Sequence, residues 1–125
     1  MNKKSLLTII LLLLGLLILS AGCGQQSETF GQHSDRTATT VSIGELLTNP
    51  AGHQNQTVVI EGKILRECPT GCWFDLAEGN AVIYVDIEPS GLAIPQRIGK
   101  TAQVIGTVKS NGPQVSIIGK GVKIR

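Results

Sequence analysis

Residues 41–125 of this 125-residue chain are predicted to form an all-β domain, a small five-stranded barrel with a short N-terminal helix. Short runs rich in Val, Ile and Thr recur between turn signals made of Gly, Pro and Asn, which is typical of strands. Two of these runs contain an internal glycine, Gly62 and Gly106, and such glycines mark the bends at which a short sheet closes on itself. The run 81–87 is apolar and β-branched. We expect it to be buried on both faces for part of its length, which favours a barrel over an open sandwich.

The first element of this domain is a short helix that begins after Ser42. Ser42 and Glu45 have the spacing of a capping box, in which the Ser side chain accepts a hydrogen bond from the backbone three residues later. Apolar residues follow, and Pro50 ends the helix after about two turns. Residues 51–56 are polar and are expected to form a loop.

The strands follow in order and are separated by turn residues and by an irregular stretch after the third strand. The predicted strands span residues 57–65, 73–76, 81–87, 101–109 and 114–118. Gly119-Lys120-Gly121 is expected to separate the fifth strand from a short closing strand at 122–125.

The barrel pattern resembles the OB-fold, a five-stranded Greek-key barrel. The segment 41–125 resembles uncharacterised bacterial OB-fold lipoproteins that carry a Cys-Pro-x-Gly-Cys-Trp-Phe loop. These are similar to the nucleic-acid-binding OB-fold superfamily of the tRNA anticodon type. The residues that carry the resemblance are Cys68, Pro69, Gly71, Cys72, Trp73, Phe74, Tyr84, Val85 and Asp86. The resemblance implies a fold and brings no activity with it.

Residues 1–22 have the layout of a secretory signal, because two lysines precede an apolar stretch from Leu6 to Leu19. A helix of this stretch would span about 21 Å, less than the roughly 30 Å hydrocarbon core of a membrane. The exit from Leu19 to Cys23 resembles the lipobox of bacterial lipoproteins, although Ser20 stands where Leu is more common. The resemblance implies cleavage before Cys23, a diacylglycerol on the Cys23 thiol, and a mature protein anchored to the outside of a bacterial cell membrane.

Residues 23–40 are predicted to be a flexible tether between the lipidated Cys23 and the barrel. The segment is rich in Ser, Thr, Gln and Gly, with one isolated Phe30 and no apolar periodicity. Such a segment cannot bury enough surface to offset the entropy lost on ordering.

The charge of the mature chain argues against a strongly basic nucleic-acid binder. Eleven Lys and Arg stand against nine Asp and Glu, and removing the two lysines of the signal leaves nine against nine. The domain has one histidine, His53, in a polar stretch and no convincing acid–base pair. We therefore expect no enzymatic activity and no obligatory cofactor.

Cys23 accounts for one of three cysteines, which leaves Cys68 and Cys72 between the first and second strands. The Pro and Gly between them favour a tight loop that brings the two sulfurs together, and an exported domain can keep a disulfide. A structural disulfide is the first expectation. The second is a soft-metal site, such as one for Cu(I), with His53 as a distant ligand. The third is a redox-active pair, although thiol oxidoreductases use a shorter spacer at a helix terminus.

Trp73, Phe74, Tyr84 and Asp86 are the candidate ligand-contacting residues, because strands two and three form the usual binding face of an OB-fold. Consecutive residues of a strand point to opposite faces, so at least one of the first two is expected in the core. The sequence predicts a lipid-anchored, non-enzymatic binding module. Its ligand, an envelope protein or a small molecule, would contact these strands and the Cys68–Cys72 loop. A copper-type metal or redox accessory protein of the cell envelope is the alternative, and an oligonucleotide-binding protein is a further one.

Overall fold

The computed structural model describes residues 2–16, 22–24 and 26–125. Helix α1 (Lys3–Leu16) lies within the predicted signal segment. Among the described residues, no helix has both the length and the apolar character needed to span a bilayer. The predicted lipobox is described only at Gly22 and Cys23, both of which are exposed. Its other members, Leu19, Ser20 and Ala21, lie outside the described residues.

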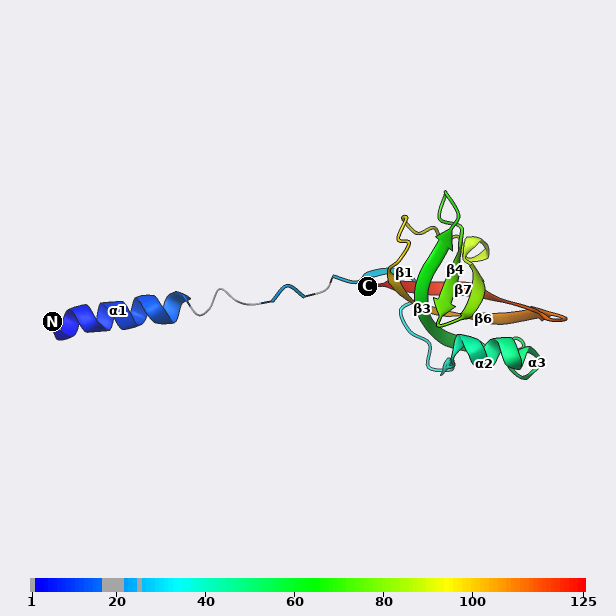
Figure 1. Ribbon diagram of the computed structural model, residues 1–125, viewed down its shortest axis with the longest axis horizontal. Coiled ribbons are helices and arrows are strands. Elements are labelled where there is room, and N and C mark those ends of the chain that lie inside the picture. Colours follow the sequence, from blue (N-terminus) through cyan, green and yellow to red (C-terminus); the bar gives the residue numbers. More distant parts are fainter. Residues whose placement is uncertain (1, 17–21, 25) are drawn as a thin grey trace.

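Strands make up most of the folded domain, with short helical elements at its ends (Figure 1). In chain order the elements are β1 (Glu28–Gly31), β2 (Thr39–Thr40), α2 (Ile43–Thr48), α3 (Pro50–His53), β3 (Thr57–Glu67), β4 (Trp73–Glu78), β5 (Ala81–Asp86), η2 (Glu88–Ser90), β6 (Thr101–Asn111) and β7 (Gln114–Ile124).

Five of these strands form a closed ring in the order β3-β4-β5-β7-β6, with β6 pairing back to β3. All neighbours in the ring are antiparallel except β5 and β7, which pair in parallel over Tyr84–Asp86 and Ser116–Ile118. The chain therefore leaves β5, enters the ring again at β6 beside β3, and closes it with β7. This connectivity confirms the predicted closed ring of five strands.

One core fills the barrel, because alternate residues of each strand point inward. Its fully buried members include Val58, Ile60, Ile64, Phe74, Leu76, Ile83, Val85, Val104, Val108 and Ile117. The two glycines predicted to bend the sheet lie where neighbouring backbones approach closely. A Cβ on Gly62 would lie 2.5 Å from the Ala77 carbonyl oxygen, and one on Gly106 would lie 2.6 Å from that of Ile118. The β6–β7 register also shifts at Gly106, as expected for a bulge.

Helix α2 packs against β4 and β5 and begins as predicted. The Ser42 hydroxyl accepts a hydrogen bond from the Glu45 backbone N–H at 3.1 Å, which confirms the N-cap. Ile43 and Leu46 are fully buried and add to the core. The predicted start and end of this helix are therefore confirmed.

The expected loop at 51–56 is wrong in its first part, because α3 forms a second helical turn there. The Asn49 side chain accepts a hydrogen bond from the Gly52 N–H at 3.3 Å and so caps this turn. Pro50 occupies its first position, where a missing N–H costs nothing. The proline that ends α2 therefore also starts α3.

Two expectations about the strands are also wrong. The glycines at 119–121 do not interrupt the last strand, because β7 runs unbroken from Gln114 to Ile124. A side chain at Gly119 would press against Ile87, 2.7 Å away, so this glycine serves close packing inside the strand. Strand β5 is not buried on both faces, because its residues alternate and Val82 and Tyr84 are each 40% exposed.

The predicted tether is structured in two places. Strand β1 pairs antiparallel with the end of β7, from Glu28 opposite Ile124 to Gly31 opposite Gly121, and β2 pairs in parallel with β3. A Cβ on Gly121 would collide with the Gln32 carbonyl oxygen, so glycine here lets the two backbones meet. A four-residue strand held by its backbone needs no long apolar pattern, which explains why the sequence did not reveal it.

Candidate functional site

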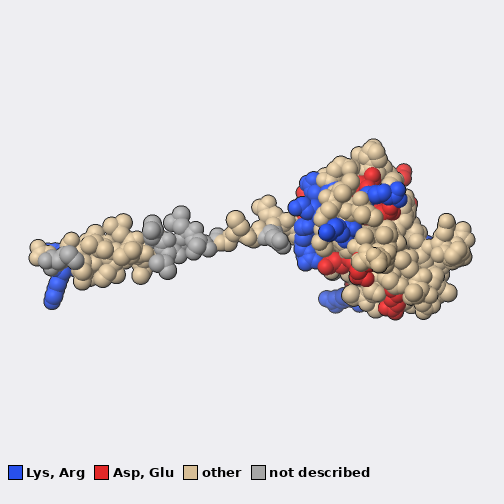
Figure 2. Space-filling model, viewed as in Figure 1, with Lys and Arg blue, Asp and Glu red and all other residues tan. Residues whose placement is uncertain are grey.

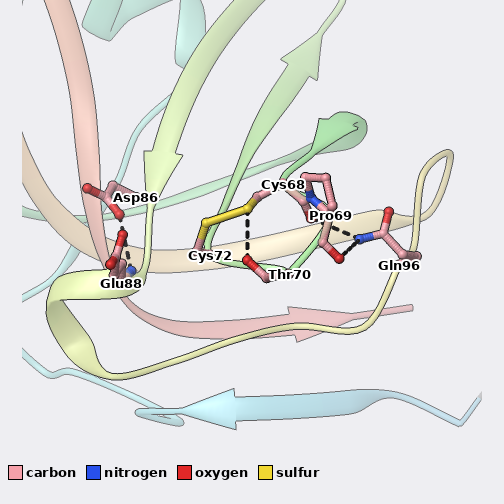
Figure 3. The surroundings of a disulfide bond; sticks show 7 residues. All are labelled: Cys68, Pro69, Thr70, Cys72, Asp86, Glu88 and Gln96. Atoms are coloured by element: carbon pink, nitrogen blue, oxygen red, sulfur yellow. Dashed lines mark hydrogen bonds between the residues drawn. A yellow bond between two sulfur atoms is a disulfide. The ribbon is translucent and has the colours of Figure 1, made fainter.

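A disulfide joins Cys68 and Cys72 in the loop between β3 and β4, as the sequence predicted (Figure 3). The two Cα atoms lie 5.6 Å apart, and Cys68 is buried. The Thr70 hydroxyl donates a hydrogen bond to the Cys68 sulfur at 3.1 Å, and the Cys68 N–H donates to the Trp73 carbonyl at 2.9 Å. The disulfide loop (residues 68–72) is therefore a compact ring that fixes the start of β4.

The disulfide loop packs against the segment that leads to β6. Gly71 has φ +75°, and a side chain there would collide with the backbone of Ile94. The Ile94 N–H donates to the Gly71 carbonyl at 3.1 Å, and the Gln96 amide donates to the Cys68 carbonyl at 2.9 Å (Figure 3). Much of the loop backbone is thus engaged internally, so the loop supports the surface beside it.

An aromatic pair lies on the outer wall of the barrel next to this loop. Trp73 of β4 and Tyr84 of β5 have ring centroids 5.5 Å apart and planes 33° apart. Tyr84 is exposed and Trp73 is half-buried. The guanidinium of Arg66, on β3, lies over the Trp73 ring at 5.9 Å from its centroid. These three residues, here called the aromatic platform, cross three adjacent strands.

Asp75 holds the arginine of the platform in place. The Asp75 carboxylate is buried, accepts a hydrogen bond from Arg66 Nε at 2.7 Å, and forms an ion pair with Nη2 at 2.5 Å. An irregularity in β3 between Ile64 and Arg66 shifts the register, so that Arg66 lies opposite Asp75. A buried carboxylate requires a charged, hydrogen-bonded partner. Here that partner is also part of the exposed surface.

Three of the four predicted ligand-contacting residues share this surface. Phe74 does not, because it is fully buried in the core, and its selection as a contact residue is wrong. Asp86 lies opposite Trp73 across β4 and β5, and its carboxylate accepts the Glu88 N–H at 3.1 Å (Figure 3). Partial burial is the main cause that raises the pKa of Tyr84 above its ordinary value of 10.0, and the carboxylates of Asp86, Asp75 and Glu88 add to it.

A hollow adjoins the platform where the β6–β7 hairpin passes β5. It has a volume of about 400 Å³ and is lined by Tyr84, Lys109, Ser110, Asn111, Gln114, Val115 and Ser116. Lys109 Nζ donates to the Asn55 side chain at 2.8 Å, and the Ser110 hydroxyl donates to the Gln54 side chain at 2.9 Å. The end of the hairpin is therefore held by the loop after α3. Tyr84 belongs to both the platform and the hollow.

The structure does not bring the predicted metal ligands together. Cys68 and Cys72 are joined to each other at one end of β3, whereas His53 precedes the other end of that 11-residue strand. His53 Nδ1 lies 3.1 Å from the Gln56 side chain, and its Nε2 lies 3.3 Å from the Glu45 carboxylate. In the part of the chain that the structure describes, no group of three His, Cys, Asp or Glu side chains has the arrangement of a metal site.

The sequence did not single out Arg66 or the β6–β7 hairpin as parts of the site. Arg66 is displaced by the register shift in β3, so its facing residue could not be counted from a regular strand. The hairpin had a usable signal, because the turn between the fourth and fifth strands borders the binding face of an OB-fold.

Known structures share this architecture, although no family model and no curated protein sequence matches the chain. The hypothetical protein YgiW from E. coli is 15% identical, with a TM-score of 0.56 over 77% of this chain and all of that one. A chain of the Stn1–Ten1 complex from S. pombe is 14% identical, with a TM-score of 0.51 over 69% of this chain and 75% of that one. A chain assigned as an aspartyl-tRNA synthetase from Leishmania major Friedlin is 12% identical, with a TM-score of 0.51 over 76% of this chain and 22% of that one. Together with the ring of five strands, these likenesses identify the fold as an OB-fold.

Proposed function

We propose that this protein is a lipid-anchored, extracytoplasmic OB-fold module that binds a ligand without transforming it. The ligand would lie on the outer face of β4 and β5, between the disulfide loop and the β6–β7 hairpin. The observation that carries the proposal is the accessible stack of Arg66, Trp73 and Tyr84 beside a hollow of about 400 Å³. An aromatic pair at the surface, held by a disulfide loop and by an arginine whose carboxylate partner is buried, is a preorganised contact surface.

The charges around the platform favour a ligand without high negative charge. Arg66 is already paired with Asp75, and Asp86 and Glu88 lie beside the aromatic rings. A polyphosphate backbone needs unpaired cations along its path. A neutral or zwitterionic ligand with a flat face can stack on the aromatic rings without electrostatic repulsion from the carboxylates. A sugar ring and a planar side chain of a partner protein are examples.

The lipid anchor of the proposal depends on Cys23. Its sequence context supports acylation, and the side chain is exposed and takes part in no disulfide. Two or three acyl chains hold a soluble domain stably at a membrane, where a single chain does not. Mass spectrometry of the protein from a bacterial host tests this part, and an unmodified Cys23 thiol would refute it.

The binding site is tested by nuclear magnetic resonance titration with two probes, a neutral N-acetylglucosamine oligomer and a single-stranded oligothymidylate. We expect the sugar to shift the resonances of Trp73 and Tyr84, and Tyr84→Ala to weaken its binding at least about fivefold, since loss of one stacking contact costs on the order of 1–3 kcal/mol. Leu47→Ala, at an exposed position on helix α2 outside this face, is the matched control and should leave binding unchanged. Sugar shifts that Tyr84→Ala does not alter would refute the location.

The same titration separates the alternatives. Salt-sensitive shifts with the oligothymidylate at the platform would favour the oligonucleotide-binding hypothesis. A copper site needs Cys68 and Cys72 as thiolates, so reactive thiols at these two cysteines before any reduction would favour the copper hypothesis. A redox-active pair would instead show a disulfide that a mild dithiol reduces while the barrel stays folded.

A further inference from the structure

A tight turn at the end of the barrel displays an apolar side chain between cations. The Lys100 N–H donates to the Arg97 carbonyl at 3.0 Å, and Gly99 at φ +85° completes the turn. Ile98 stands at its tip and is 63% exposed, more than any other large apolar side chain among the described residues of the barrel. The turn therefore presents an apolar side chain at a fixed position on the surface, where burying it would gain free energy.

Basic residues surround this turn. Lys63 pairs with Thr101, and Thr101 exchanges two backbone hydrogen bonds with Arg125, which places both bases beside Lys100. Lys123 lies two residues earlier on β7, and its side chain is exposed. Figure 2 shows Lys and Arg gathered over the side of the barrel where β1 and the C-terminus lie.

The local charge is positive although the mature chain is neutral. This end of the barrel has five basic residues, Lys63, Arg97, Lys100, Lys123 and Arg125. It has three acidic residues, which bond to Arg97 and Arg125. Glu28 pairs with Arg97 at 2.8 Å, Glu61 pairs with Arg125 at 2.5 Å, and Glu67 accepts the Arg97 backbone N–H at 2.5 Å. This end of the barrel therefore carries +2, and the remaining residues from Cys23 onward carry −2.

The chain enters the barrel at the same place. Glu28 begins β1 and makes two hydrogen bonds of 2.8 Å with the Arg97 guanidinium, next to Ile98. Four residues separate Glu28 from Cys23, and five extended peptide units span at most about 18 Å. Acyl chains on Cys23 would therefore hold this end of the barrel close to the lipid headgroups.

We propose that the Arg97–Lys100 turn, together with Lys63, Lys123 and Arg125, docks the barrel on the anionic phospholipids that surround its own anchor. The cations bind headgroup phosphates, and Ile98 enters the boundary between headgroups and acyl chains. The inference rests on the proposed lipid anchor and adds which face of the domain meets the membrane. The two rings of the aromatic platform lie on β4 and β5, which carry none of these docking residues, so the rings stay open to their ligand.

The test uses the full chain, produced in a bacterial host and reconstituted in vesicles of brominated lipid. Trp73 is the single tryptophan, so Ile98→Trp in a Trp73→Phe background places one emitter at the turn. Bromine on the acyl chains should quench this emitter in vesicles containing phosphatidylglycerol and much less in phosphatidylcholine alone. Lys100→Gln and Lys123→Gln should each lower the docking constant about fivefold, whereas Lys109→Gln on the hairpin should not.

Val82→Trp in the same background is the matched control, because Val82 is exposed on β5 away from the turn. Circular dichroism confirms that each variant is folded. Quenching at position 98 no stronger than at position 82, or equal in the two lipids, would overturn the docking proposal. The mass of Cys23 in the same sample tests the anchor separately. An acylated but unquenched protein refutes the docking alone, and a quenched protein with an unmodified thiol refutes the anchor alone.

Discussion

Removing the Cys68–Cys72 bond should destabilise the domain by an amount that the loop length sets. The disulfide closes a ring of five residues, counting both cysteines. The chain-entropy relation gives about 2 kcal/mol for a ring of this size at 25 °C. For a domain of roughly 100 residues, this loss lowers the melting temperature by about 8 to 16 °C.

Hydrogen bonds from Ile94 and Gln96 keep the loop on its course when the sulfurs are separated, so we expect a folded variant. The measurement is urea and thermal unfolding of Cys68→Ala/Cys72→Ala in a Cys23→Ala background. The parent protein is unfolded with and without reductant as the control. Equal unfolding free energies in the two conditions would refute the reasoning. So would a loss several times larger than 2 kcal/mol, because the loop would then do more than limit chain entropy.

Three further predictions concern the platform, the N-terminal strand and the helix cap. Tyr84 is the single tyrosine, so its deprotonation can be followed by ultraviolet absorbance at alkaline pH. The titration midpoint of Tyr84 should lie above 10.0, and it should be lower in Asp86→Asn than in the parent protein. The unfolded chain loses the Tyr84 phenol proton at a lower pH than the folded protein does, so the free energy of unfolding should decline as pH rises above 10. A midpoint at or below 10 would contradict the partial burial of the phenol. In Gly121→Ala the new Cβ would collide with the Gln32 carbonyl oxygen, so β1 should separate from β7. Amide hydrogen exchange in residues 29–31 should then be at least tenfold faster, and the amides of the barrel strands are the internal control. Ser42→Ala should cost about 1 kcal/mol of unfolding free energy, which Ser42→Asp restores; equal stability of all three proteins would exclude the cap.

Local sequence signals predicted the parts of the fold that depend on local chemistry. The spacing of Ser42 and Glu45 marked the helix start, and of the two glycines predicted to bend the sheet, Gly106 lies at a shift in strand register. The short Cys68–Cys72 spacing gave the disulfide without knowledge of the barrel. Each of these features involves residues that are close in the chain or a backbone constraint that only glycine meets.

The parts that the sequence did not predict depend on contacts between distant residues. Strand β1 forms because β7 offers a backbone edge that glycine leaves open, which no pattern within residues 28–31 reveals. Arg66 meets Asp75 only after a shift in strand register. The apolar character of 81–87 suggested burial on both faces, yet the barrel covers only the inner one. Apolar composition alone therefore did not separate a core strand from a contact surface.

The contact between Trp73 and Tyr84 means that the intrinsic fluorescence of the protein reports on this surface. The chain has one tryptophan and one tyrosine, and their rings lie 5.5 Å apart. At this separation the excited phenol passes its energy to the indole, so the folded protein emits almost entirely as tryptophan. A molecule that covers the indole would change the polarity around it and shift this tryptophan emission, and the signal needs no dye and no mutation.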